Sequence, residues 1–425
     1  MADDKDSLSF KERLLGRALK VVAAVPPLHR LVNKRLINSY ANAAGFRPRA
    51  FSMAASYPTW RGLTDRRYSG RHLPAEPDYT KALPPAEEVL KLFKKSGDLR
   101  ARDTSLLFPF FAQWFTDSFL RTKWKEPEDQ DFAKNESNHE IDLCQIYGIT
   151  EDETKLLRAF KGGRLKSQIL NGEEYPVPLF EERGGQMVLH PDFEELYSKE
   201  NFNRVFANAD DAHKKTSFAV GLEHGNSTLG NTLMNTLFLR EHNRIAGELQ
   251  KAHPDWDDER WFQTARNICI VLLLKIVIGD YIVHIAPAEF PLMVVPGMAE
   301  KERWYRTNWI AVEFALLYRW HDLIPSTVSF AGETRDSSAL RHGNGWLLEL
   351  GVDRACREAS HQLAGKITLG NTPDFLMKVK ENSLAMARRC ELAPYNAYRE
   401  HYGKAPMRSF EQLTRDPALA KTLKE

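Results

Sequence analysis

The chain has 425 residues, of which 43% are apolar and 27% are charged, and its formal net charge is +2. This composition is typical of a globular protein with a large core, and the near-neutral charge gives no indication of a nucleic-acid partner. The four cysteines lie far apart and form no CxxC pair. They argue against a structural zinc site and a disulfide framework, and together with the missing secretory signal they predict a reducing, cytoplasmic location.

The first 50 residues differ from the rest of the chain. Residues 9–41 have apolar positions at helical spacing, with Pro26 between two amphipathic pieces. Residues 13–49 contain eight Lys and Arg and no Asp or Glu. Such a segment either contacts a membrane surface peripherally or forms a helical arm with a solvated basic face, and the sequence favours neither. We divide the chain into these N-terminal helices, residues 1–50, and a main domain, residues 51–425.

The main domain is expected to be mainly α. Residues 43–103 are rich in Pro, Gly and Arg and predict an extended segment, after which Asp103 and Thr104 are placed to cap a helix. A short hairpin is expected near residues 168–175, and the apolar run 268–278, too short to cross a bilayer, predicts a buried core helix. Further helices are expected at 141–160, 227–252, 257–285, 307–323, 346–365, 373–391 and 409–423.

The helix expected at 307–323 carries two side chains suited to redox chemistry. Helical spacing places Phe314, Leu317, Tyr318 and His321 along one apolar stripe. A buried, neutral imidazole is what an axial haem ligand needs, and a tyrosine can lose an electron and a proton to give a delocalised radical. On spacing alone, a histidine on an apolar face is more often a packed core residue.

A second candidate site lies on the helix that follows Thr104. Gln113 and Asp117 are four residues apart and share one face, while phenylalanines fill the other sides. Two polar groups on an aromatic helix indicate either a lined pocket or an edge that faces solvent.

Ten stretches of the main domain form an ordered set. They are FFAQWFTDSFLRT (110–122), IDLCQIYG (141–148), GRLKSQILNGEEYP (163–176), FAVG (218–221), LREHNRI (239–245), HPDW (253–256), FQTAR (262–266), KIVIGDYIVH (275–284), EFALLYRWHDLIPST (313–327) and SFEQLT (409–414). In this order and spacing the chain resembles the cyclooxygenase (prostaglandin-endoperoxide synthase) branch of the animal-type haem peroxidases, over roughly residues 60–420. The resemblance implies a large helical domain that holds a haem b between helices. The family's disulfide-bonded growth-factor-like module is absent, which with the scattered cysteines and the missing signal suggests a bacterial-type member.

The resemblance also implies roles for single residues. In the family's LYxWH motif the histidine is the proximal haem ligand and the tyrosine is the catalytic radical; here these are His321 and Tyr318. Trp320 fills the tryptophan of the same motif. In the DYxxH motif the tyrosine hydrogen-bonds to the radical tyrosine, and here it is Tyr281. The proximal side of the family site is therefore expected to be intact.

The distal side departs from the family's AQxFTH motif, because Gln113 is kept and Asp117 stands at the histidine position. A carboxylate is a weaker base than an imidazole unless it is desolvated, so we do not expect efficient peroxidase turnover. His224 is expected near the distal pocket wall as an alternative acid–base group, and Thr122 is placed with the haem-binding residues. Other branches of the superfamily bind calcium through an aspartate after the distal histidine; Ser118 stands there, so no calcium is expected.

Two departures concern the substrate. The family's channel mouth pairs a tyrosine and an arginine; Ala288 stands at the tyrosine position, and no arginine aligns near Tyr40. Lys34 and Arg35 are possible substitutes. The chain ends at Glu425, where the family's chains continue with a segment that closes much of the fatty-acid channel.

Three functions fit this pattern. The first is a haem-dependent dioxygenase of polyunsaturated fatty acids, which would use a Tyr318 radical and dioxygen. The second is a haem peroxidase that reduces hydroperoxides with Asp117 or His224 as the acid–base group. The third is a haem-binding member of the family that has lost turnover. The sequence does not indicate an oligomeric state.

Overall fold

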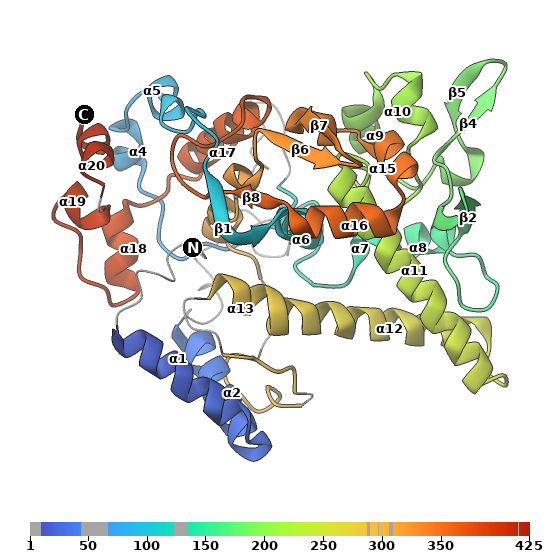
Figure 1. The fold of residues 1–425 in the computed structure, drawn as a ribbon, viewed down its shortest axis with the longest axis horizontal. Coiled ribbons are helices and arrows are strands. Elements are labelled where there is room, and N and C mark those ends of the chain that lie inside the picture. Colours follow the sequence, from blue (N-terminus) through green and yellow to red (C-terminus); the bar gives the residue numbers. More distant parts are fainter. Residues whose placement is uncertain are drawn as a thin grey trace, which may run out of the picture.

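The computed structural model describes residues 10–43, 67–122, 134–286, 290–295, 297–305, 309–414 and 416–425. Helices dominate these residues, and two long helices cross the right and lower parts of the molecule (Figure 1). Strands in the described residues pair as four two-stranded sheets. The prediction of a mainly α class is therefore confirmed.

The helices vary in length from single turns to almost seven turns. They are α1 (Phe10–Ala23), α2 (Pro26–Ala43), α4 (Pro77–Lys81), α5 (Ala86–Lys91), α6 (Leu107–Thr116), α7 (Cys144–Tyr147), α8 (Glu151–Leu157), α9 (Lys199–Phe206), α10 (Asp211–Lys215), α11 (Leu229–Ala252), α12 (Asp258–Ile276), α13 (Ile282–Ile285), α14 (Val312–Leu317), α15 (Asn344–Leu350), α16 (Val352–His361), α17 (Met377–Arg389), α18 (Tyr395–His401), α19 (Phe410–Leu413) and α20 (Pro417–Lys424). A π-helical turn, η3 (Val277–Tyr281), joins α12 to α13, and a 3-10 turn, η4 (His321–Leu323), follows α14.

The four sheets are all antiparallel pairs. They are β1 (Arg100–Ser105) with β8 (Leu363–Gly365), β2 (Ser167–Leu170) with β3 (Glu173–Pro176), β4 (Phe180–Arg183) with β5 (Gln186–Leu189), and β6 (Thr327–Phe330) with β7 (Glu333–Asp336). The hairpin expected near residues 168–175 is confirmed as β2 and β3. Its turn residues Asn171 and Gly172 both have positive φ, 51° and 81°, as a two-residue hairpin turn requires.

Helix α11 is the centre of the main domain and packs against α6, α12, α15 and α16. The Thr228 side chain caps its first turn by accepting from the Asn231 amide. The contact with α6 is close, because a Cβ at Gly230 would lie 2.6 Å from Phe110 Cγ. In the same contact Trp114 Nε1 donates to Asn235 Oδ1 at 2.7 Å. This contact fixes α6, which carries the candidate polar residues.

The start of α6 differs from the prediction. Asp103 and Thr104 belong to strand β1 and do not cap a helix; Leu106 occupies the N-cap position without a side-chain bond. The reason is a long-range contact, because β1 pairs with β8 and the Leu106 amide donates to the Gln362 carbonyl at 2.8 Å. Of the extended segment expected at 43–103, the described part forms α4, α5 and β1.

The prediction of a single helix at residues 307–323 is wrong. Helix α14 ends at Leu317, Tyr318 leaves helical geometry at ψ 49°, and His321 begins a separate 3-10 turn. Leu317 is 77% exposed, so the expected apolar stripe does not form. The turn after α14 is held by the buried side chain of Asp322, which accepts from Thr372 and Lys380 in distant segments. The helical spacing of apolar residues in this segment does not indicate those two contacts.

The helix expected at 257–285 is confirmed, but the prediction that its apolar run 268–278 is buried in the core is not. Asp257 caps α12, and the π-helical turn carries the chain into α13 without a break. The continuous helix Asp258–Ile285 is long and apolar enough to be a candidate membrane span, and 22% of its most apolar stretch is buried inside the structure. Cys269 and Leu273 face the core, whereas Ile268 and Val271 are 37% and 46% exposed. A stretch that is apolar on every side does not reveal which face is covered.

The remaining predicted helices are mostly confirmed, with breaks at glycines. Residues 141–160 form α7 and α8, separated by Gly148 at φ 82°, and residues 346–365 contain α15 and α16, separated by Gly351 at φ 77°. Residues 373–391 contain α17, and residues 409–423 contain α19 and α20.

The N-terminal helices α1 and α2 form as expected, and α2 packs on the segment that follows α13. Asn33 Nδ2 donates to the Met293 carbonyl at 3.0 Å, and the Met293 amide donates back to Asn33 Oδ1 at 2.9 Å. Lys34, a candidate for holding a substrate carboxylate, pairs with Glu302 at 3.0 Å. Ala288, the other residue of that prediction, lies outside the described residues.

Candidate functional site

Two tyrosines from distant segments of the chain meet in the core. Tyr281 ends the π-helical turn η3 and is 4% exposed, and Tyr318 follows α14. Their hydroxyl groups are in direct contact. Burial raises the pKa of Tyr318 well above its usual value, so this residue is a neutral phenol at physiological pH. The structure thus brings together the two tyrosines that the sequence pairs.

Aromatic rings surround the tyrosine pair. Trp320 stacks on Tyr318 with ring centroids 4.2 Å apart. Phe108 of α6 stacks on Tyr281 at 4.9 Å, and Phe111 lies 5.5 Å from the same ring. An apolar aromatic environment of this kind excludes water and disfavours a charged phenolate. It leaves loss of a hydrogen atom as the chemistry that suits Tyr318.

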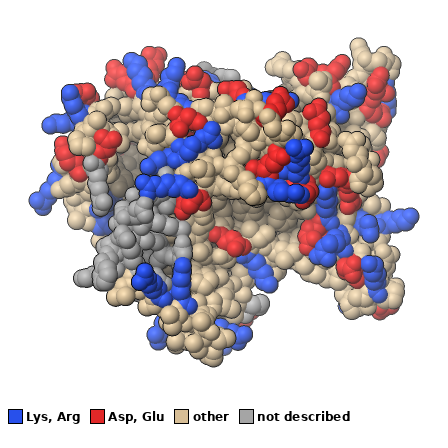
Figure 2. Space-filling view, in the orientation of Figure 1, with Lys and Arg blue, Asp and Glu red and all other residues tan. Residues whose placement is uncertain are grey.

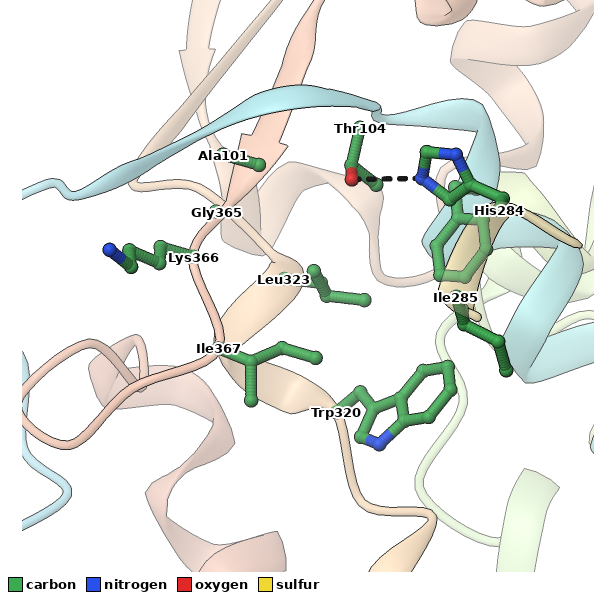
Figure 3. Close-up of a pocket in the computed structure, with 10 residues that line it drawn as sticks. Ala101, Thr104, His284, Ile285, Trp320, Leu323, Gly365, Lys366 and Ile367 are labelled. Atoms are coloured by element: carbon green, nitrogen blue, oxygen red, sulfur yellow. Dashed lines mark hydrogen bonds between the residues drawn. The ribbon is translucent and has the colours of Figure 1, made fainter. Parts of the chain in front are cut away.

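A small cavity of about 30 Å³ lies beside Trp320 (Figure 3). Thr104 Oγ1 and His284 Nε2 are hydrogen-bonded at 3.0 Å at one edge, and the Lys366 amino group points away from the centre. The volume corresponds to about one water molecule. The lining residues are Ala101, Thr104, Phe108, His284, Ile285, Trp320, Leu323, Gly365, Lys366 and Ile367.

His321 is a neutral, partly buried imidazole. Burial, together with the positive charges of Lys380 and Arg319, lowers the pKa of His321 to about 3. Its Nδ1 atom is buried and has no hydrogen-bond partner within the described part of the chain. An unprotonated ring with an unused buried nitrogen is suited to binding a metal ion. His321 and Tyr318 do not share a helix face, because Tyr318 follows α14 and His321 begins the separate turn η4.

The predicted distal residues lie at the end of α6. Asp117 is the C-cap of α6, and its Oδ2 accepts from Asn231 Nδ2 at 3.1 Å and lies 3.2 Å from His224 Nε2. Gln113, one turn earlier on the same face, is exposed although its neighbours in α6 are buried. The sequence suggested Asp117 and His224 as alternatives, and the structure makes them direct partners.

A cavity of about 370 Å³ opens beside this pair. Three of the predicted residues line it together, namely Asp117, Thr122 and His224, whereas Gln113 and the tyrosine pair do not. Arg319, two residues before His321, and residues of α17 also line it; His321 itself is not among the lining residues. The other lining residues are Leu120, Arg121, Glu136, Arg204, Val379, Asn382, Ser383 and Met386.

Charge is tightly organised at the wall of this cavity. Burial opposes protonation of His224, but the negative charge of Asp117 and hydrogen bonds to Asp117 and Glu223 raise its pKa to about 9. Burial also opposes ionisation of Glu223, yet hydrogen bonding to His224 and the charge of Arg121 hold its pKa well below the usual range. Arg121 and Arg204 both contact the Glu223 carboxylate. At neutral pH His224 is therefore an imidazolium in contact with carboxylates.

Several residues of this arrangement were not predicted. Arg121 and Glu223 lie next to predicted residues in the sequence, and their charge within apolar stretches was the available signal. Asp322 and Lys380 lie beside His321 and are 4% and 8% exposed. Asp322 directly follows His321 in the chain, but no local sequence pattern indicates Lys380, which lies 58 residues after Asp322.

The residues present fit a haem in two respects. His321 offers a neutral nitrogen with no other partner, as an axial ligand requires. The cavity between Asp117, Thr122 and Arg319, next to the exposed Gln113, provides a polar surface that a large flat group can cover. Arg319 gives this cavity a cationic group suited to a carboxylate of such a group, whereas Arg121 and Arg204 are paired with Glu223.

Comparisons with known proteins agree with this geometry. Residues 109–425 match the model of the animal haem peroxidase family. The chain is 32% identical to prostaglandin G/H synthase 2 of Equus caballus over 95% of its own length and 65% of the relative, and 33% identical to the Bos taurus protein over 88% and 60%. The chain thus spans less than two thirds of the length of these relatives.

Solved structures show the same fold at low sequence identity. Fatty acid alpha-dioxygenase of Oryza sativa superposes with a TM-score of 0.64 at 16% identity, covering 99% of this chain and 82% of that one. Peroxidase A from Dictyostelium discoideum superposes with a TM-score of 0.60 at 18% identity, covering 84% and 76%. Since the family model matches most of the chain and relatives exceed 30% identity over nearly all of it, the chain belongs to the animal haem peroxidase family.

Proposed function

We propose that the protein is a haem-dependent dioxygenase of polyunsaturated fatty acids that uses a radical on Tyr318. The observation that carries this proposal is the contact between the Tyr318 and Tyr281 hydroxyls inside an aromatic cluster. Tyr318 also lies three residues before the neutral His321. Relatives named prostaglandin G/H synthase and a structural neighbour named fatty acid alpha-dioxygenase support an oxygenase acting on a fatty acid.

The chemistry assigned to this chain is hydrogen-atom transfer. With a hydroperoxide as the oxidant that is reduced, bound haem b would supply the one-electron oxidation of Tyr318, and Tyr318 gives up its hydroxyl proton with the electron. The oxidised Tyr318 takes a hydrogen atom from a carbon between two double bonds, which re-forms its O–H bond and leaves a carbon radical. Dioxygen adds to that carbon, and the peroxyl radical takes the hydrogen back from Tyr318 to give a hydroperoxide. Tyr281 holds the Tyr318 hydroxyl group in place throughout.

The direct test is Tyr318→Phe in the haem-loaded protein with linoleate and dioxygen. Oxygen uptake should be lost, because phenylalanine has no O–H bond to exchange. Tyr305→Phe is the control, since Tyr305 is 58% exposed and lies outside the cluster. Unchanged oxygen uptake in Tyr318→Phe would end the proposal. Haem binding without any turnover in the wild-type protein would instead favour a family member that has lost its activity.

A second candidate is the reduction of hydroperoxides, and the pairing of Asp117 with His224 favours it. Asp117 can accept the proton of the hydroperoxide, and the His224 imidazolium can donate a proton to the leaving oxygen, so the pair divides the work of one distal histidine. Asp117→Asn should abolish peroxide-dependent oxidation of a small reductant. Asn231→Ala, which removes a neutral donor to the same carboxylate, should reduce the rate less.

We further propose that haem b is the only prosthetic group and that no calcium is required. Ser118 stands where other branches use an aspartate, and its hydroxyl donates to the Phe115 carbonyl at 2.9 Å, so it is already engaged. Metal analysis of the purified protein should find iron, and calcium chelation should leave the melting temperature unchanged.

We also propose peripheral membrane contact through residues 9–41 in a reducing, cytoplasmic compartment. Val21 and Leu31 are 70% and 48% exposed, and basic side chains lie on the part formed by α1 and α2 (Figure 2). Each of the four cysteines is free, which supports the compartment. Val21→Asp should reduce co-sedimentation with anionic vesicles, and unchanged co-sedimentation would reject the contact.

A further inference from the structure

A buried ion pair lies directly beside His321. Lys380 of α17 is 8% exposed and Asp322 is 4% exposed, and Lys380 Nζ donates to Asp322 Oδ2 at 3.3 Å. Burying both ions costs the hydration of each, and a pair of apolar residues of similar size is often as stable. The presence of this pair therefore needs a reason other than the stability of the fold.

The Lys380 ammonium group holds the chain on both sides of the histidine. It donates to the Asp322 carboxylate and also to the Arg319 carbonyl oxygen at 3.4 Å. Arg319 lies two residues before His321 and Asp322 lies one residue after it. The ring of Phe93 covers the ammonium group at 4.9 Å. One side chain thus fixes both ends of the turn that presents the imidazole.

The Asp322 side of this turn has two more anchors. The fully buried Thr372 donates its hydroxyl hydrogen to Asp322 Oδ1. The Asp322 carbonyl oxygen lies against Gly365 of β8, where a Cβ would come within 2.1 Å. Movement of the turn is therefore restricted from α17, from β8 and from the segment between them.

Helix α17 connects this turn with the large cavity. Val379, Ser383 and Met386 line the cavity, whereas Lys380 contacts the turn. The same helix thus sets a wall of the cavity and the place of His321. We propose that Lys380 is a positioning residue that fixes the His321 imidazole toward the haem iron through its bonds to Arg319 and Asp322. This inference rests on haem ligation by His321 and on no particular substrate.

The test compares Lys380→Met with Lys378→Met in the full chain. Lys378 lies on the same helix with a 73% exposed side chain and a surface ion pair to Glu381 at 2.8 Å, which makes it a matched control. Haem is titrated into each folded protein and followed at the Soret band, and the iron–histidine stretching band of the ferrous form is recorded by resonance Raman. Lys380→Met should weaken haem binding about 10- to 100-fold, as for groups that orient metal ligands, and shift or broaden the band. Lys378→Met should change neither.

A purely structural ion pair gives a different result. It would lower the melting temperature of the haem-free protein but leave the haem affinity and the Raman band of the folded protein unchanged, and that outcome overturns the inference. If Lys380→Met does not fold, the double variant Lys380→Met/Asp322→Asn decides, because it leaves no lone charge buried. If the double variant binds haem as tightly as the wild type, the inference about Lys380 is overturned but the proposed function is not. A wild-type protein that binds no haem overturns the proposed function as well.

Discussion

The contact between His224 and Asp117 predicts a large pH dependence of stability. The pKa of His224 is raised from 6.5 to about 9 in the folded chain, so the folded state binds this proton more tightly than the unfolded state. The resulting stabilisation is fully present below about pH 6.5 and is lost as the pH rises through about 9. At about 1.4 kcal/mol for each pH unit it amounts to about 3 kcal/mol.

The assay is urea denaturation of the haem-free protein at several values between about pH 6 and pH 10. His224→Gln removes the titrating group, so the difference in free energy of unfolding between wild type and variant should shrink by about 3 kcal/mol across this range. His253→Gln, at an exposed position, controls for the loss of a histidine. A difference between wild type and His224→Gln that stays constant with pH would refute the reasoning.

Three more predictions concern packing and capping. Gly365→Ala would place a Cβ 2.1 Å from the Asp322 carbonyl oxygen, which is backbone and cannot move aside, and should destabilise the protein by about 1–3 kcal/mol or more in thermal unfolding. Trp114→Phe leaves the buried Asn235 oxygen without its donor and should cost about 1–3 kcal/mol in chemical denaturation. Thr150→Ala breaks the capping box of α8 and should cost about 1 kcal/mol in the same assay.

The contact between two tyrosines could be predicted from the sequence, whereas the local geometry around them could not. Tyr281 and Tyr318 are paired by motif resemblance alone, and the structure places their hydroxyls in contact. The helix expected to carry both Tyr318 and His321 does not form, because Asp322 is bound by residues 50 and 58 positions away. Helical periodicity reports only which faces are apolar, so it could not register a turn that is held by side chains from elsewhere.

The same limitation applies to the distal residues and to α12. Asp117 and His224 are more than 100 positions apart, and their contact depends on how the loop before α11 folds over the end of α6. In α12 the sequence is apolar on all sides, so composition predicts burial everywhere, whereas Val271 is 46% exposed. In both cases the missing information is tertiary, since it concerns which element covers a given face.

Helix α6 separates the residues of the two reactions that we propose. Its phenylalanines face Tyr281 in an apolar cluster, whereas its last turn ends in Asp117 beside His224 and the open cavity. Hydrogen-atom transfer by Tyr318 needs a neutral phenol, and burial keeps its pKa well above the usual value. Proton delivery to a hydroperoxide instead needs the His224 imidazolium, whose pKa is about 9. The two functions should therefore respond differently to alkaline pH.

This difference can be measured on one haem-loaded preparation. Peroxide-dependent oxidation of a small reductant should fall as the pH rises through about 9, because His224 loses the proton that it donates. Oxygen uptake with linoleate, started with a hydroperoxide at neutral pH and followed after a jump to alkaline pH, should persist over the same range, because each turnover re-forms the Tyr318 O–H bond and burial keeps that phenol protonated. His224→Gln should have little peroxide activity at any pH and no inflection near pH 9. If both activities fall together in the wild-type protein, α6 does not separate them, and a shared group must control both.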